Sequence, residues 1–305
     1  MKFDFISRSV VKELLEENDY ISNRNIEITI FNAIKLQVPL LIDGPAGVGK
    51  TEIAKVLTKI FNASLIRVQC YEGIDFTKVL YDYNYSKQLL FVNLVKDNVK
   101  TIIKGKDIHS SIELLNRETD FFGENFLIER PLLRAISPKD SSPKVLLIDE
   151  IDKSDVEFEA FLLEMLSDFS VSIPEYGTIS AEERPIVVLT SNATRELSEA
   201  LKRRCIYLYI DYPVPEVEAK ILITKVNIEY DFANKIASAV KKIRSLPLKQ
   251  KPSVAETINW SKALLLTMEE PDFSVHNKVE IDSTLNVLLK NHNDIETVIN
   301  SSYLV

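Results

Sequence analysis

The residues with the clearest chemistry lie in one glycine-rich stretch, GPAGVGKT at positions 44–51. The chain has 7 glycines in 305 residues, yet Gly44, Gly47 and Gly49 fall within six positions. The spacing fits G-x-x-x-x-G-K-[ST], a loop whose backbone N–H groups turn inward and cradle phosphates. Glycine is needed there because side chains at the closest points would exclude the phosphates. The stretch therefore predicts a nucleotide site.

Each residue of this loop has an expected role. Lys50 would reach the β- and γ-phosphates of ATP, and Thr51 would help to hold Mg²⁺. The helix that follows the loop adds the positive potential of its N-terminus. We expect the nucleotide to be held by the loop, the next residue and one acid described below, which together are Gly44, Pro45, Ala46, Gly47, Val48, Gly49, Lys50, Thr51, Glu52 and Asp149.

A second motif, VLLIDEID at 145–152, ends an apolar run with two acids. An acid at the end of a buried strand is costly unless it has a partner or a function. We expect Asp149 to bind the Mg²⁺ and Glu150 to orient or deprotonate an attacking water. Activation of water favours a hydrolase over a small-molecule kinase. The alternative, that these acids only cap a helix, is weaker because Ser154 with Glu157 predicts a capping box there.

Two further motifs carry polar groups after apolar segments. Asn192 ends VVLTSN and could position the water or polarise the γ-phosphate, or it could be a turn residue. Arg203 and Arg204 end a short predicted helix, where a guanidinium could reach a neighbouring subunit's γ-phosphate. The alternative for this pair is cationic capping of the helix.

The elements that must position these residues alternate along the chain. Short apolar runs at 38–43, 64–70, 144–151, 185–192 and 206–212 look like buried strands, with helical patterns between them. This alternation predicts an α/β fold with a mostly parallel sheet. VSIPEYGTI at 171–179 predicts a small hairpin. Beyond Pro213 the patterns are helical, which divides the chain into a nucleotide-binding core at 1–213, with an N-terminal helical segment, and a helical lid at 214–305.

Composition narrows the class of protein. The formal net charge is −8, which weakens any proposal of non-specific nucleic-acid binding despite the basic stretch at 241–251. No apolar run is long enough to span a bilayer, and the N-terminus lacks the apolar region of a signal peptide. The chain is expected to be cytoplasmic. Cys70 and Cys205 lie far apart and predict neither a disulfide framework nor a zinc site.

Taken together, these motifs resemble an AAA+ ATPase, more narrowly the MoxR branch and its CoxD-like members. The resemblance spans roughly residues 20–268. Beyond the phosphate loop, it rests on LIRVQCYEGID (65–75), RPLLRAI (130–136), LLIDEIDKSDVEFEAFLLEMLSDF (146–169), VSIPEYGTI (171–179), PIVVLTSNATRELSEALKRRC (185–205) and KPSVAETINWSKAL (251–264).

The resemblance implies a P-loop core with a small helical lid, assembled into a ring that is usually hexameric. Asp149 and Glu150 match the family's Walker B pair and Asn192 its sensor 1. Arg204 best matches the arginine finger, with Arg203 second. The hairpin at 171–179 matches one that faces the pore of the ring.

The family resemblance also suggests a biological role. MoxR-type ATPases act as chaperones, often with a partner that bears a von Willebrand factor A domain, and CoxD-like members are associated with maturation of a metal-containing enzyme. Two assignments depend on alignment alone. Tyr20 and Ile21 fall where the family contacts adenine, and Ala255 stands where many relatives carry a lid arginine. Lys251 or Arg244 would be the substitutes for that arginine.

Three functions stay open at this point. The first is a Mg²⁺-dependent ATPase that remodels a client protein. The second is an ATP-gated assembly switch with little turnover, which the absent lid arginine favours slightly. The third is a DNA-associated motor, against which the acidic balance argues. Tyr71 could belong to an aromatic pore loop, although an aromatic residue after a strand is more commonly core or interface.

Overall fold

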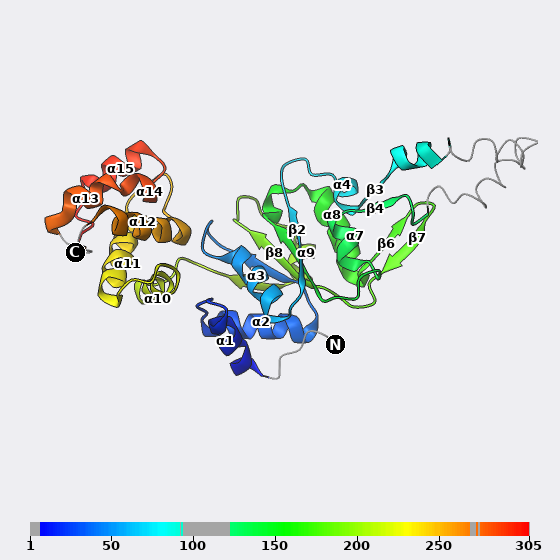
Figure 1. The fold of residues 1–305 in the computed structure, drawn as a ribbon, viewed down its shortest axis with the longest axis horizontal. Helices are drawn as coiled ribbons and strands as arrows, with labels where there is room; N and C mark the ends of the chain where they lie inside the picture. Colours follow the sequence, from blue (N-terminus) through cyan, green and yellow to red (C-terminus); the bar gives the residue numbers. More distant parts are fainter. Residues whose placement is uncertain (1–6, 92, 94–122, 269–272, 274, 305) are drawn as a thin grey trace, which may run out of the picture.

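The computed structural model describes residues 7–91, 93, 123–268, 273 and 275–304 (Figure 1). Its centre is a five-stranded sheet in the order β2-β5-β8-β1-β9, and all neighbouring strands are parallel. The strands are β1 (Leu40–Asp43), β2 (Ser64–Gln69), β5 (Lys144–Asp149), β8 (Ile186–Ser191) and β9 (Ile206–Tyr209). The predicted α/β fold with a parallel sheet is confirmed.

Helices cover both faces of this sheet, and the apolar side chains alternate accordingly. On β5, Val145 and Leu147 pack toward one helical layer while Leu146 and Ile148 pack toward the other. The first layer is formed by α1 (Arg8–Glu17), α2 (Arg24–Leu36) and α3 (Lys50–Ile60). The second contains α4 (Phe76–Leu80), α7 (Pro131–Ile136), α8 (Val156–Asp168) and α9 (Glu199–Arg203). Strands buried on both faces read as continuous apolar runs, which explains the sequence pattern.

Two of the predicted buried strands are buried on one side only. β2 and β9 are the edges of the sheet, so each has a single strand neighbour. In β2, Ile66 and Val68 are buried while Leu65, Arg67 and Gln69 are exposed. The prediction of buried strands was therefore wrong for one face of each, where Arg67 and Gln69 of β2 and Tyr207 and Tyr209 of β9 are exposed. The exposed face of β2 borders the site described below.

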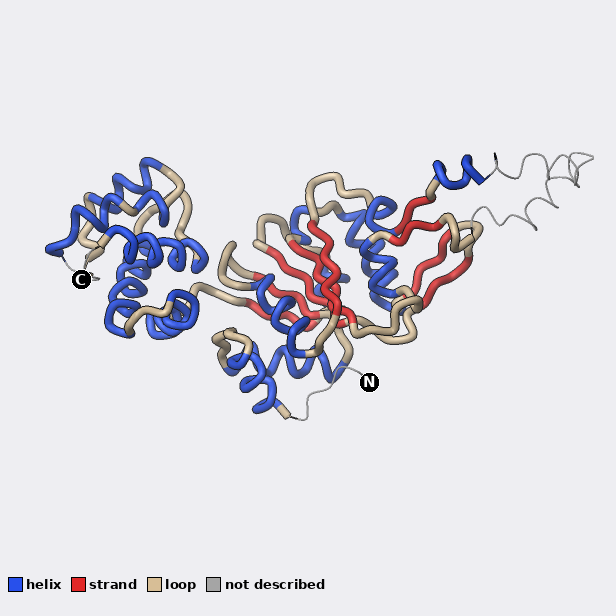
Figure 2. The backbone as a smooth tube through the Cα atoms, in the orientation of Figure 1, coloured by secondary structure: helices blue, strands red, loops and turns tan. Residues whose placement is uncertain are grey.

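Short elements complete the core. β3 (Tyr81–Tyr83) pairs with β4 (Leu127–Glu129), and β6 (Ser170–Ile173) pairs with β7 (Gly177–Ser180) as the predicted hairpin (Figure 2). The capping box predicted for α8 is wrong. Asp155 caps this helix by accepting from the Phe158 N–H. Ser154 directly follows η1 (Ile151–Lys153), and its Oγ donates to the carbonyl of Ile151, the first residue of η1.

The C-terminal part is helical and has its own core. Its elements are α10 (Pro215–Val226), α11 (Tyr230–Ser245), α12 (Val254–Thr267), η2 (Val275–Asn277), α13 (Lys278–Ser283), α14 (Leu285–Leu288) and α15 (His292–Ile299). A separate apolar cluster runs from Ala219 to Tyr303, with Trp260 fully buried in it. The last predicted helix is interrupted between α14 and α15.

Figure 1 shows that this helical part lies at one end of the molecule and is joined to the sheet by a single connection after β9. The division of the chain at residue 213 stays a prediction. Parts of both predicted domains, at 1–6, 92, 94–122, 269–272, 274 and 305, lie outside the described residues.

A buried ion pair ties the helical part together at its junction with the core. Arg244 on α11 donates to both oxygens of Glu218 on α10, at 2.6 and 2.8 Å, and to the Pro252 carbonyl at 2.8 Å. Its guanidinium also lies 4.5 Å from the centre of the Tyr212 ring in the connection. Arg244 is therefore engaged within the helical part, and its suggested role in place of a lid arginine stays a prediction.

We predict that Arg244→Met lowers the free energy of unfolding by about 3–5 kcal/mol, because it leaves the buried Glu218 carboxylate without its partner. Urea unfolding of the full chain measures this. The double variant Arg244→Met with Glu218→Leu should recover much of the loss, since it removes both charges. Equal stability of the single and double variants would contradict this account.

Candidate nucleotide-binding site

The predicted phosphate loop joins β1 to α3 at the carboxyl edge of the sheet. Gly44, Gly47 and Gly49 have φ values of +146°, +72° and +97°, which side chains rarely allow. A Cβ on Gly44 would lie 2.0 Å from the Ile210 carbonyl oxygen, and one on Gly47 would lie 2.4 Å from Ser253 Cβ. The glycines are thus required by backbone conformation and, at Gly44 and Gly47, by close neighbours.

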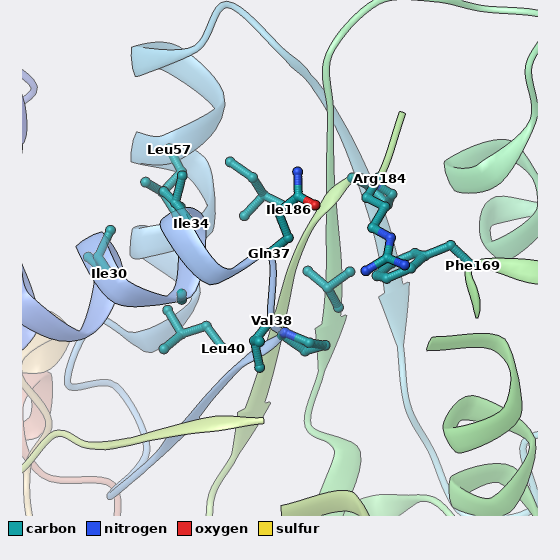
Figure 3. Close-up of a pocket in the computed structure, with 13 residues that line it drawn as sticks. Ile30, Ile34, Gln37, Val38, Leu40, Leu57, Phe169, Arg184 and Ile186 are labelled. Carbon is teal, nitrogen blue, oxygen red and sulfur yellow. The ribbon is translucent and has the colours of Figure 1, made fainter. Parts of the chain in front are cut away.

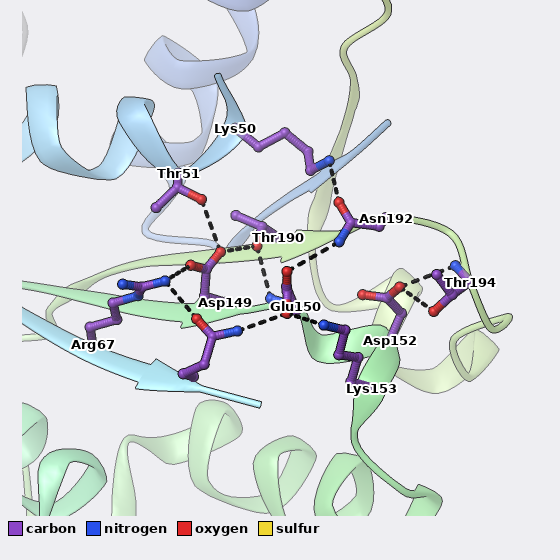
Figure 4. A network of polar contacts seen from close by, with 11 residues as sticks. Lys50, Thr51, Arg67, Asp149, Glu150, Asp152, Lys153, Thr190, Asn192 and Thr194 are labelled. Atoms are coloured by element: carbon purple, nitrogen blue, oxygen red, sulfur yellow. Dashed lines mark hydrogen bonds and ion pairs between the residues drawn. The ribbon is translucent and has the colours of Figure 1, made fainter. Parts of the chain in front are cut away.

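Lys50 lies inside the loop at the start of α3. Its Nζ donates to the carbonyl oxygens of Gly44 and Pro45, at 2.6 and 2.7 Å, and to Asn192 Oδ1 at 2.8 Å (Figure 4). Burial lowers the pKa of Lys50, and the nearby carboxylates offset part of that effect. All three hydrogen-bond partners of the Lys50 ammonium group are oxygen atoms. Phosphate oxygens could take the place of these partners.

Asp149 accepts hydrogen bonds from three elements at the end of β5. Its Oδ1 accepts from Thr51 Oγ1 at 3.0 Å and from Thr190 Oγ1 at 2.5 Å, and its Oδ2 accepts from Arg67 Nη2 at 2.5 Å. The residue is only 4% exposed. These contacts place a buried carboxylate directly beside the first turn of α3, where Thr51 lies.

Glu150 follows in a left-handed conformation, with a φ of +57°. Non-glycine residues adopt this conformation at a cost, and such strain concentrates at functional sites. One carboxylate oxygen of Glu150 accepts from Gln69 Nε2 at 2.9 Å and pairs with Lys153 Nζ at 2.6 Å. The other faces Asn192 Nδ2 at 3.5 Å. The Glu150 carboxylate therefore lies between Gln69 of β2 and Asn192 after β8.

Asn192 bridges the two halves of the arrangement. Its amide oxygen accepts from Lys50 and its amide nitrogen lies toward Glu150 (Figure 4). The segment that follows Asn192 is held by Asp152, whose Oδ2 accepts from the Thr194 backbone and hydroxyl at 3.1 and 2.6 Å. Burial alone would raise the pKa of Asp152, but the hydrogen bonds from Thr194 and the backbone lower it. Asp152 therefore stays ionised and anchors the loop after β8.

These side chains surround one cleft of about 330 Å³. The residues that line it are Ala46, Gly47, Gly49, Lys50, Thr51, Glu52, Arg67, Asp149, Glu150, Thr190, Asn192 and Ala255. Gly44, Pro45 and Val48 do not line it, although the first two accept hydrogen bonds from Lys50.

A second, largely apolar cavity of about 30 Å³ lies near the amino ends of β1 and β8 (Figure 3). Its polar side chains are Gln37 and Arg184, and Arg184 lies over the Phe169 ring at 5.1 Å. No carboxylate lines this cavity. This cavity therefore lacks the acids and the phosphate-loop residues that line the cleft of about 330 Å³.

Comparison with known proteins decides the family. The family model "AAA domain (dynein-related subfamily)" matches residues 39–205, more than half of the chain. The chain belongs to this family. AAA domains form a family of nucleotide-hydrolysing ATPases whose members typically assemble into oligomeric rings. A comparison with curated proteins found no match.

Solved structures that resemble this AAA domain share little sequence with it. The Thermotoga maritima RuvB Holliday junction branch migration motor is 15% identical, with 92% of this chain and 67% of that chain covered and a TM-score of 0.43. A substituted variant of the Thermotoga maritima RuvB is 17% identical, with 93% and 70% covered and a TM-score of 0.47. A candidate ATPase of Cytophaga hutchinsonii ATCC 33406 is 15% identical, with 96% and 85% covered and a TM-score of 0.47.

The residues of this AAA domain fit a nucleotide-bound Mg²⁺. Thr51 Oγ1 and Asp149 Oδ1 lie 3.0 Å apart, and both are hard oxygen ligands of the kind that Mg²⁺ prefers. Within the described ranges, no group of three or more His, Cys, Asp or Glu residues could hold a metal ion by itself. This donor set suits Mg²⁺ that arrives with phosphates, because Mg²⁺ is usually held by one or two protein ligands plus phosphates and water.

The other predicted site residues lie outside the cleft. Arg203 and Arg204 are exposed at the end of α9, and Arg204 Nη1 donates to the Leu163 carbonyl at 2.7 Å. Tyr20 is buried, and its ring lies 4.0 Å from the position of a Cβ on Gly49. Ile21 is half-buried. Their roles as arginine finger and adenine contacts therefore stay predictions.

Sequence reasoning missed three residues of this network. Arg67 and Gln69 reach Asp149 and Glu150 from β2, and Thr190 bonds to Asp149 from β8. A signal was present, because Arg67 and Gln69 alternate with the apolar residues of IRVQ and so share one face of a strand. Their partners could be identified only once the order of the strands was known.

Among the helices of the described part, none is both long and apolar enough to cross a membrane.

We predict that Gly47→Ala lowers the free energy of unfolding by about 1–3 kcal/mol more than Gly73→Ala does, because only the first is overpacked. Gly73 is a matched control, with a φ of +74° and no heavy atom within 4 Å of an added Cβ. Urea unfolding measures the difference, and binding of fluorescent mant-ATP should weaken in Gly47→Ala alone. Equal effects of the two substitutions would show that the contact with Ser253 is unimportant.

Proposed function

We propose that this AAA domain protein binds and hydrolyses ATP in the presence of Mg²⁺. The observation that carries the proposal is the linked set of Lys50, Asp149 with Thr51, Glu150 and Asn192 around one cleft of about 330 Å³. A cation, a carboxylate–hydroxyl pair, a second carboxylate and an amide are the groups that hydrolysis of a phosphoanhydride needs. The roles assigned to these residues are part of the proposal.

The binding step follows from the contacts of the loop. Backbone N–H groups of the loop and the N-terminus of the 11-residue helix α3 would bind the phosphate oxygens. Lys50 would exchange its carbonyl partners for phosphate oxygens, which are better matched to its charge. Thr51 and Asp149 would hold Mg²⁺, which when bound offsets the negative charge that develops on the phosphates. Tyr20 and Ile21 are proposed to contact the adenine.

The hydrolytic step depends on Glu150 and Asn192. The Glu150 oxygen that faces Asn192 at 3.5 Å has the weaker contact, whereas the other is held by Gln69 and Lys153. The first oxygen is thus the one we propose to accept a proton from the attacking water. Asn192, which also contacts Lys50, would orient that water against the terminal phosphate.

We further propose a MoxR-type chaperone that remodels a client protein or matures a metalloenzyme. This rests on the sequence segments that resemble the MoxR branch, above all VSIPEYGTI and PIVVLTSNATRELSEALKRRC. A helical lid at 214–305, a homo-oligomeric, hexameric ring with Arg204 or Arg203 as the arginine finger, and a partner with a von Willebrand factor A domain belong to the same proposal. So does a cytoplasmic location, with which the free thiols of Cys70 and Cys205 agree.

One observation favours a second candidate, an ATP-gated assembly switch. Ala255 lines the cleft at the start of α12, and Arg244 is engaged with Glu218 instead of reaching the cleft. Without a lid cation, nucleotide binding could change assembly while turnover stays low. A DNA-associated motor has less support, since the net charge is −8.

We predict that Glu150→Gln binds mant-ATP within a few-fold of the unsubstituted protein but hydrolyses ATP about 10²–10⁴-fold more slowly, because the general base is lost. The exposed Glu157→Gln is the matched control and should leave turnover unchanged. Phosphate release measures turnover. Normal turnover by Glu150→Gln would overturn its assignment, and negligible turnover by the unsubstituted protein, even at high concentration, would favour the switch.

We predict that turnover per protomer rises with protein concentration and then saturates, because active sites are completed between subunits. Arg204→Ala should remain slow at every concentration. Mixing Arg204→Ala with Glu150→Gln should restore part of the activity, since each variant supplies the residue that the other lacks. No recovery on mixing, with both variants folded and assembled by light scattering, would contradict a role of Arg204 in a neighbouring site.

A further inference from the structure

Arg67 is a cation that lines the cleft and that has no role in the proposed binding and hydrolysis of ATP. It lies in β2, at the edge of the sheet, and its side chain is about half exposed, at 52%. Its Nη2 donates to Asp149 Oδ2 at 2.5 Å and to Gln69 Oε1 at 2.5 Å (Figure 4). Arg67 thus bonds to the carboxylate that would hold Mg²⁺.

The two partners differ in their freedom to move. The Asp149 side chain is 5% exposed and fixed by the hydroxyls of Thr51 and Thr190. Arg67 reaches it from a solvent-facing strand edge on a long, flexible side chain. Displacement of this contact would therefore move Arg67 and leave Asp149 in place.

The charge balance explains why a cation lies there. A buried carboxylate without a counter-charge is costly, so Asp149 needs a cationic partner when no metal is bound. Lys50 bonds to Gly44, Pro45 and Asn192 instead. Within the described part of the chain, Arg67 is the cation found within 4.0 Å of Asp149.

We propose that Arg67 occupies the cation position at Asp149 in the metal-free protein and competes with Mg²⁺ for that carboxylate. The inference rests on the proposed function, in which Thr51 and Asp149 hold the metal. Arg67 is a positioning residue here, since it acts through Asp149. Once displaced, its planar guanidinium stays beside the cleft, where it suits phosphate oxygens bidentately.

The test measures the metal requirement of nucleotide binding, which does not depend on turnover. Mant-ADP fluorescence is titrated with Mn²⁺ in place of Mg²⁺, and the half-saturating Mn²⁺ concentration is compared between variants. For Arg67→Gln we expect this concentration to fall by about tenfold, as the loss of one charge-assisted hydrogen bond in competition with the metal implies. Arg67→Lys, which keeps the charge, should lie between Arg67→Gln and the unsubstituted protein.

A second measurement addresses the metal-free state. In EDTA, Arg67→Gln should unfold at a lower temperature, because Asp149 loses its partner, and saturating Mn²⁺ with mant-ADP should remove most of that difference. Arg130→Gln is the matched control. Arg130 pairs with Asp82 at 3.1 Å and is 45% exposed, outside the cleft, so its removal should not change the Mn²⁺ requirement.

The outcomes separate this inference from the proposed function. An unchanged or higher Mn²⁺ requirement in Arg67→Gln, in a protein that still binds mant-ADP, would overturn the competition while leaving the nucleotide site intact. If the unsubstituted protein fails to bind mant-ADP at any Mn²⁺ concentration, the proposed function itself fails, and the inference fails with it.

Discussion

The carboxylate of Asp149 is the point on which the arrangement of the site depends. It is 4% exposed and lies at the end of β5, an inner strand of the sheet. A charge buried to this degree must be paired and hydrogen-bonded. Its partners come from three other elements, Thr51 on α3, Thr190 on β8 and Arg67 on β2. Satisfying one carboxylate therefore fixes the first turn of the phosphate-loop helix against two strands of the sheet.

The order of the strands makes this possible. In a parallel sheet the carboxyl ends of all strands meet at one edge, so the loops after β1, β5 and β8 converge there. β5 and β8 are neighbours, which brings Asn192 from the end of β8 beside Glu150. Helices pack on both faces of the sheet against the apolar side chains of its strands.

The start of α12 connects the helical part to the same site. Ser253 caps α12 and lies so close to Gly47 that any side chain on that glycine would collide with it. Arg244 bonds to Pro252, the residue before this cap, and lies over Tyr212 in the connection to the core. The buried pair with Glu218 thus links the position of α12 to the connection after β9.

The sequence by itself determined the features that depend only on residues close together in the chain. The phosphate loop, the acids after an apolar strand and the hairpin at 171–179 are each contiguous, so residue types and spacing predicted them. Even local capping was misjudged, since Asp155 caps α8 while Ser154 closes η1. Contacts between distant segments, such as Arg67 with Asp149 across 82 positions, were decided only by the tertiary structure. Strand order sets which side chains meet, and no local pattern encodes that order.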